Sequence, residues 1–159
     1  MDSDSAQDYF EILLDYQYDL LFVRQWGVNH TEFIFVQTAK VIQAHDNVRK
    51  SFFTKTENTL LSGYLIDSNT KTRPKDYIPD DFIWFLAHLT RWHEFVLICD
   101  KIKGSPFDKW SSNPLIKSSD VLADALSDNW EDRDFYEVFS GNADWLKSIS
   151  TSSLSLIHI

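Results

Sequence analysis

The sequence predicts an all-α fold, a single-domain bundle of about five helices around a central buried helix at 79–103. Apolar residues recur at steps of three and four, the spacing that places side chains on one face of a helix. They make up 43% of the chain, which has only four Gly and four Pro, so disordered and low-complexity classes are excluded. A chain of 159 residues is long enough to bury a core without disulfide or metal cross-links. We expect one helical domain over 1–153.

Three helices are predicted in the first part of the chain. The first, over 6–26, has apolar residues at steps of four and three. The second begins near Asn29, because Asn29 and Glu32 have the spacing of a capping box, and continues to Ala44. A short strand over 33–36 is the alternative there, since Phe-Ile-Phe-Val has strand propensity. The third helix, over 47–66, precedes a polar loop at 67–79.

The segment 79–103 has helix signals at both ends. Pro79 and Asp81 suit a first turn, and Gly104 follows the last turn. Apolar residues occur on nearly all sides of this helix, so we expect the other helices to pack around it. The side chains expected in the core are Trp84, Leu89, Trp92 and Phe95, with His88 hydrogen-bonded to a neighbouring helix.

The C-terminal part contains a predicted helix at 119–126 and an acidic helical piece at 132–139, after an irregular connection at 104–118. The last residues, 154–159, read Leu-Ser-Leu-Ile-His-Ile, a translation of CTG TCT CTT ATA CAC ATC. That string resembles the mosaic-end adapter of transposase-based sequencing libraries. We therefore expect this segment to be an artefact without a packed role, and the natural chain to continue differently beyond about Ser153.

Cysteine usage and the N-terminus indicate a compartment. The single cysteine, Cys99, lies in an apolar run, which favours a buried, inert thiol in a reducing environment. The chain begins Met-Asp-Ser-Asp-Ser, acidic where a signal peptide is basic, and no apolar run reaches the roughly 18 residues of a membrane span. We expect a cytoplasmic protein that does not contact a membrane.

Sequence motifs give little support to an enzyme. The chain has no phosphate-binding glycine loop, no Cys-x-x-Cys pair and no His-Glu-x-x-His. The adjacent His45 and Asp46 resemble the His-Asp pair of the HD phosphohydrolases. The resemblance implies a divalent metal that activates water against a phosphate ester, held by His30, His45, Asp46 and Asp100. The sequence departs from that family in two respects: few residues separate the first histidine, His30, from the His-Asp pair, and the glycine that usually follows in the family is missing. The other interpretation places His45 and Asp46 near a helix end, where Asp46 or Asn47 caps the next helix.

Charge is concentrated at two ends of the chain, which has a net charge of −9. Residues 1–20 contain six carboxylates and no Lys or Arg, and residues 120–137 contain seven carboxylates and one Arg. Helical spacing arranges these groups in two stripes. The N-terminal stripe is Asp8, Glu11, Asp15 and Asp19, and the C-terminal stripe is Asp120, Asp124, Asp128 and Glu131.

This pattern predicts an acidic binding face. We expect the two stripes to adjoin on one side of the domain, with Trp130 and Tyr136 as aromatic anchors of the kind found in interface hot spots. Such a face would repel nucleic acid and would attract a basic protein partner.

The function predicted from charge, size and missing motifs is a non-enzymatic protein-binding module that needs no cofactor. An immunity or antitoxin-like inhibitor of a basic toxin or nuclease is its most concrete form, because nuclease clefts are basic in order to hold phosphates. The alternatives are the HD-like metal-dependent phosphohydrolase, the N-terminal part of a larger protein, and a solvated acidic face that serves solubility alone.

Overall fold

The computed structural model describes residues 1–62, 64, 66–67, 69–110 and 113–140. Over these residues the chain forms six α-helices and no strand, which confirms the predicted all-α fold. The helices are α1 (Ser3–Tyr18), α2 (Val28–Ala44), α3 (Asp46–Leu61), α4 (Asp80–Thr90), α5 (His93–Ile102) and α6 (Ser118–Leu126). None of the helices in the described part has the length and apolar character that a membrane crossing requires.

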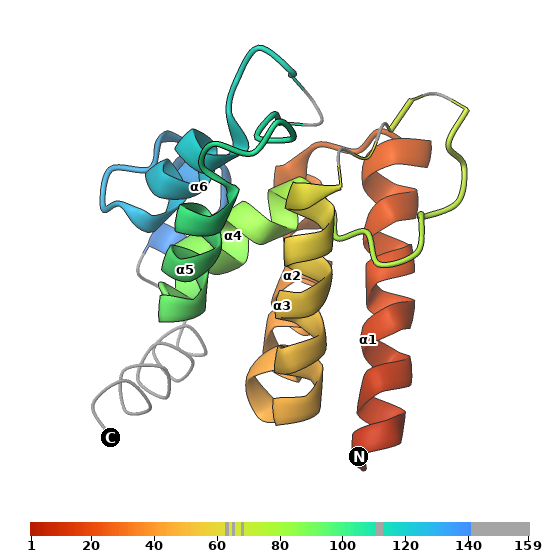
Figure 1. Ribbon diagram of the computed structural model, residues 1–159. Helices are drawn as coiled ribbons and strands as arrows, with labels where there is room; N and C mark the ends of the chain where they lie inside the picture. Colours follow the sequence, from red (N-terminus) through yellow and green to blue (C-terminus); the bar gives the residue numbers. More distant parts are fainter. Residues whose placement is uncertain (63, 65, 68, 111–112, 141–159) are drawn as a thin grey trace.

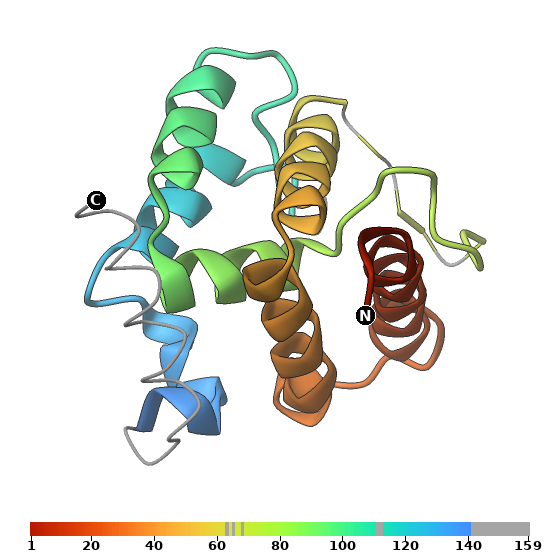
Figure 2. The same ribbon diagram turned by 90° about the horizontal axis from the view of Figure 1, so that it is seen from below.

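The helices form two groups joined by α4. On one side α1 packs against α2 and α3, and on the other side α5 packs against α6 (Figure 1). Between them α4 crosses the middle of the molecule and contacts both α2 and α6, as the view from below also shows (Figure 2). The side chains of α4 are buried along almost its whole length, with Trp84 at 1% exposure. The core predicted for this segment is confirmed, since Leu89, Trp92 and Phe95 are buried as well.

The predicted continuous helix at 79–103 is wrong at its centre, because α4 ends at Thr90 and α5 begins at His93. Arg91 closes α4 in the left-handed region at φ 52°, a conformation that costs a non-glycine residue about 1–2 kcal/mol. Trp92 follows, buried at 1% exposure. A single straight helix with apolar residues on all sides would need partners all around it. Two helices that run in different directions can bury those residues against neighbours that lie on different sides.

Several predicted boundaries change for reasons that lie in tertiary contacts. The strand alternative at 33–36 is excluded because these residues lie inside α2. The predicted capping box is wrong, since Gly27 precedes the first turn of α2 and the Glu32 carboxylate accepts the Glu137 N–H at 2.7 Å instead. The acidic piece at 132–139 forms two 3₁₀ helices, Glu131–Phe135 and Glu137–Ser140. The segment 154–159 lies outside the described residues.

Candidate functional site

The carboxylates of the N-terminal stripe are largely occupied by cations of the same chain. Arg73, whose side chain is only 7% exposed, donates from Nε to Asp15 and from Nη2 to Glu11. Lys55 of α3 binds Glu11 at 3.0 Å and Asp76 at 2.8 Å. This ion network, made of Glu11, Asp15, Lys55, Arg73 and Asp76, joins α1 to α3 and to the loop after it.

The ion network lowers the pKa values of Glu11 and Asp76. Burial raises the pKa of Glu11, but hydrogen bonds from Lys55 and Arg73 outweigh burial, so the net pKa is lowered. The hydrogen bond from Lys55 lowers the pKa of Asp76. Both carboxyl groups are therefore held in the ionised form by cations of the chain itself. At the end of the stripe Asp19 binds Arg24 at 2.7 Å, whereas Asp8 is exposed.

The C-terminal carboxylates have few cations near them. We call the exposed carboxylates of α6, of the turn after it and of the first 3₁₀ helix the acidic surface; its members are Asp120, Asp124, Asp128, Glu131, Asp132 and Asp134. Among the ion pairs of the described residues, only Asp128 of this set takes part, with Arg91. Arg133, within the first 3₁₀ helix, donates to the backbone carbonyls of Asp128 and Phe139.

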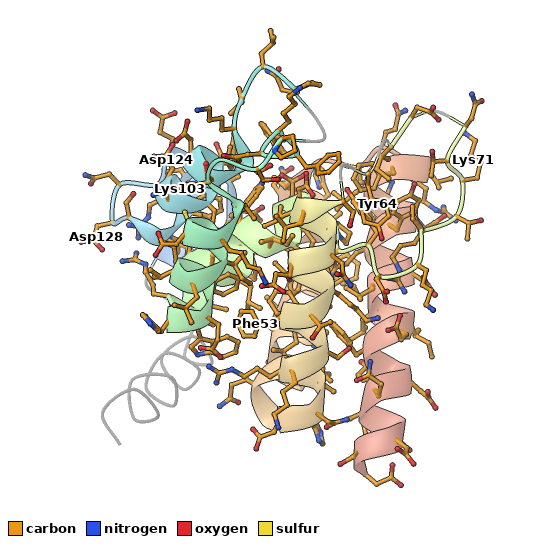
Figure 3. All side chains as sticks on the ribbon, in the orientation of Figure 1. Phe53, Tyr64, Lys71, Lys103, Asp124 and Asp128 are labelled. Carbon is orange, nitrogen blue, oxygen red and sulfur yellow. The ribbon has the colours of Figure 1, made fainter. Side chains whose placement is uncertain are left out.

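The two stripes do not adjoin, so this part of the sequence prediction is wrong. Both views place α1 and α6 on opposite sides of the molecule, with α2 and α3 between them (Figures 1 and 2). Asp124 and Asp128 point outward at the edge remote from α1 (Figure 3). Helical spacing placed Glu11 and Asp15 together on α1, but α6 ends at Leu126, so Asp128 and Glu131 lie outside the helix that carries Asp120 and Asp124. Such spacing carries no information on how two helices that are distant in the sequence are oriented.

Trp130 and Tyr136 also differ from the prediction, because they are buried at 5% and 4% exposure rather than offered as surface anchors. They stack on one another with ring centroids 5.9 Å apart, and the Trp130 ring lies 5.0 Å from that of His88. His88 contacts the Ala125 carbonyl through Nδ1 at 2.7 Å, which confirms its predicted bond to a neighbouring helix. Burial lowers the pKa of His88, and the neutral imidazole donates Nδ1–H to that carbonyl.

A pocket of about 390 Å³ lies between α6 and the loop that precedes it. Its apolar lining residues include Trp110, Ile116, Val121 and Trp130. Its carboxylates are Asp124, Glu131 and Asp132. No Lys or Arg is among the described residues that line it. The pocket thus combines apolar walls with the carboxylates of the acidic surface.

A buried carboxylate fixes the loop that forms one wall of this pocket. Asp108 accepts the backbone N–H of Ser119 at 2.8 Å and the Ser119 hydroxyl at 2.6 Å. The first turn of α6 has unpaired N–H groups and a positive dipole end, so a carboxylate there is stabilising. The loop residue Trp110 donates its backbone N–H to the Ile116 carbonyl at 2.8 Å. Sequence reasoning missed Asp108, because nothing in the irregular connection marks it as the partner of a helix that begins ten residues later.

The residues of the HD-like alternative are not brought together. His30 lies in the first turn of α2 and His45 directly after its last residue. A helix rises 1.5 Å per residue, so their backbones are about 22 Å apart, too far to share one ion. His45 precedes α3 and neither Asp46 nor Asn47 caps it; Asn47 donates to the Ser3 carbonyl instead. In the described part of the chain no group of three or more His, Cys, Asp or Glu residues is arranged to hold a metal ion, and Asp100 lies on α5.

Comparisons with protein-family models, curated proteins and solved structures found no match to this chain.

Proposed function

We propose that the chain is a non-enzymatic protein-binding module that recognises a basic partner protein through the acidic surface on α6 and the first 3₁₀ helix. The observation that carries the proposal is the difference between the two acidic regions. Glu11, Asp15 and Asp19 are bound by cations of the same chain, whereas most carboxylates of the acidic surface form no ion pair with another described residue.

Uncompensated charge favours association more than stability. Exposed like charges on one helix repel one another and weaken the fold slightly, while they accelerate the encounter with a protein of opposite charge. A pocket within such a surface gives the partner a concave contact as well. An inhibitor of a basic toxin or nuclease is the form of this function that we propose, because such enzymes keep a cationic cleft for phosphates.

The test uses the purified products of the genes adjacent to this one. Each is titrated against the chain, and the association rate is measured by stopped-flow fluorescence between low and physiological salt. We expect one basic product to bind with an association rate that falls steeply as salt increases. The absence of saturable binding by every adjacent product would reject the inhibitor function.

A matched pair of variants locates the binding surface. Asp120→Asn with Asp124→Asn removes two charges from the acidic surface, and Asp4→Asn with Asp8→Asn removes two exposed charges from α1, on the other side of the molecule. The first pair should slow association roughly tenfold at low salt, and the second pair should have a much smaller effect. Equal effects of the two pairs would indicate net charge alone and would contradict a localised surface.

A further inference from the structure

The geometry points to a specific use of the pocket between α6 and its preceding loop: we infer that it receives an arginine side chain of the basic partner. This inference rests on the proposed function and deepens it, because it names the group on the partner and the residues that hold it. The residues that carry the inference are Trp110, Val121, Asp124, Trp130 and Glu131.

The pocket has room for a long side chain. Its volume of about 390 Å³ is near the lower end of the range for small-molecule sites. Val121 and the two tryptophans line it with apolar groups, against which the methylene stem of a long side chain can pack. Trp130 is held in place by its contacts with His88 and Tyr136, so this wall is already ordered before a partner arrives.

The charge of the pocket selects a cation. Asp124, Glu131 and Asp132 line it together, and no described lining residue supplies a positive charge. Burial and the nearby charge of Glu131 raise the pKa of Asp132, as expected where carboxylates lie close together and repel one another. A guanidinium placed among them would relieve that repulsion.

Arginine fits better than lysine for two reasons. The planar guanidinium stacks on aromatic rings, and the pocket has two tryptophans. It also presents several N–H donors in a fixed fork, which can satisfy two carboxylates at once, whereas a lysine ammonium acts as a point charge.

The experiment follows the indole N–H signals of Trp110 and Trp130 by two-dimensional NMR during titration with N-acetyl-arginine amide. The neutral isostere N-acetyl-citrulline amide is the matched control ligand, and N-acetyl-lysine amide tests the preference for a planar cation. We expect saturable shifts with the arginine compound, weaker shifts with the lysine compound and none with citrulline. Equal shifts of the indole signals with the citrulline and arginine compounds would overturn the inference.

Two double variants then separate the pocket from the surface around it. Asp124→Asn with Glu131→Gln changes the pocket, and Asp120→Asn with Asp134→Asn makes the same change of charge outside it. The first should weaken arginine binding roughly tenfold, about 1.4 kcal/mol, and the second less than about twofold. Thermal midpoints of both double variants check that the fold is retained.

The same variants distinguish this inference from the proposed function. If the pocket is used, the pocket variant releases the basic partner faster, and N-acetyl-arginine amide competes with the partner. If the partner binds, shows the salt dependence of the acidic surface and dissociates equally fast from both double variants, the pocket inference is overturned and the proposed function stands. If arginine fills the pocket but no adjacent gene product binds, the proposed function is rejected and only the chemistry of the pocket is supported.

Discussion

Asp81 lies near the start of α4, where burial and the neighbouring charge of Asp132 raise the pKa of its carboxyl group to about 6. The same surroundings raise the pKa of Tyr136, through burial first and then through the charges of Asp81 and Asp132. Glu32, whose pKa burial also raises, faces the same region through its bond to the Glu137 backbone. The junction of α2, α4 and the C-terminal 3₁₀ helices therefore favours neutral side chains.

Asp81 should make the protein less stable as the pH rises. In an unfolded chain an aspartate has a pKa of about 4, so the folded state binds this proton more tightly. Its contribution to the free energy of unfolding is complete below about pH 4 and is lost as the pH rises through 6. Asp81→Asn should thus stabilise the protein at pH 7, by up to roughly 3 kcal/mol, and have little effect at pH 4. Urea unfolding of both proteins at the two pH values measures this.

The control for Asp81 is Asp120→Asn, a change to an exposed carboxylate, which should leave the free energy of unfolding within about 0.5 kcal/mol. A variant at Asp81 that is less stable than the wild type at pH 7 would contradict the burial argument.

The positive charge of Arg73, in contrast, stabilises the fold. Arg73→Met removes the donors that Glu11, Asp15 and the Tyr77 carbonyl share, and should lower the free energy of unfolding by about 2 kcal/mol. Arg24→Met removes a cation from an exposed pair, with Arg24 62% exposed, and should change the free energy of unfolding much less. Since the pKa of Glu11 is lowered, the stabilisation by Arg73 should weaken as the pH falls below about 4. Equal costs for the two substitutions at pH 7 would show that the ion network contributes no more than a surface pair.

At the scale of elements, the junction between α4 and α5 determines how the two groups of helices meet. Thr90 donates to the Leu86 carbonyl at 2.9 Å, and Arg91 turns the chain through the left-handed region. The next side chain, Trp92, packs under the guanidinium of Arg49, which lies 3.8 Å from the ring centroid. Arg49 in turn binds Glu94 of α5 at 2.8 Å. The turn is thus held by contacts from α3 on one side and α5 on the other.

Trp92→Ala should destabilise the protein strongly, because it removes a buried ring and leaves a cavity at this junction. The expected cost is on the order of 3–5 kcal/mol. Trp26→Ala is the matched substitution at a site that is 44% exposed, and it should cost less than about 1 kcal/mol. Guanidinium unfolding of both variants gives the comparison. Similar small costs would mean that the ring of Trp92 does not hold α4 and α5 together.

The helices themselves were predictable because their periodicity is local. The break at Arg91 was not, since neither Gly nor Pro occurs there and the turn is stabilised by residues far along the chain. For the same reason, the ion-pair partners of the carboxylates could not be predicted. Spacing correctly grouped Glu11 with Asp15, but their cation lies 62 residues beyond Glu11, in a loop with no pattern of its own.

At the scale of the whole molecule, the sequence predicted where the carboxylates lie along the chain but not which of them the fold neutralises. The acidic excess at the two ends looked equivalent in the sequence, with six and seven carboxylates. Folding brings Lys55 and Arg73 to the first group and leaves the second around a pocket. The pocket itself could not be predicted, because Trp110 and Trp130 come together only after the loop is fixed by Asp108.

The bond between Glu32 and the Glu137 N–H spans 105 residues, and it has a consequence for the growing chain on the ribosome. The segments α1 to α3 can pair soon after they emerge, because their contacts are close in sequence. The face of α4 that carries Phe85 and His88 stays uncovered until Trp130, Tyr136 and Phe139 have been synthesised. We therefore expect nascent chains that stop before residue 130 to expose an aggregation-prone apolar surface and to require chaperones. Chains released after residue 140 should bury this surface themselves.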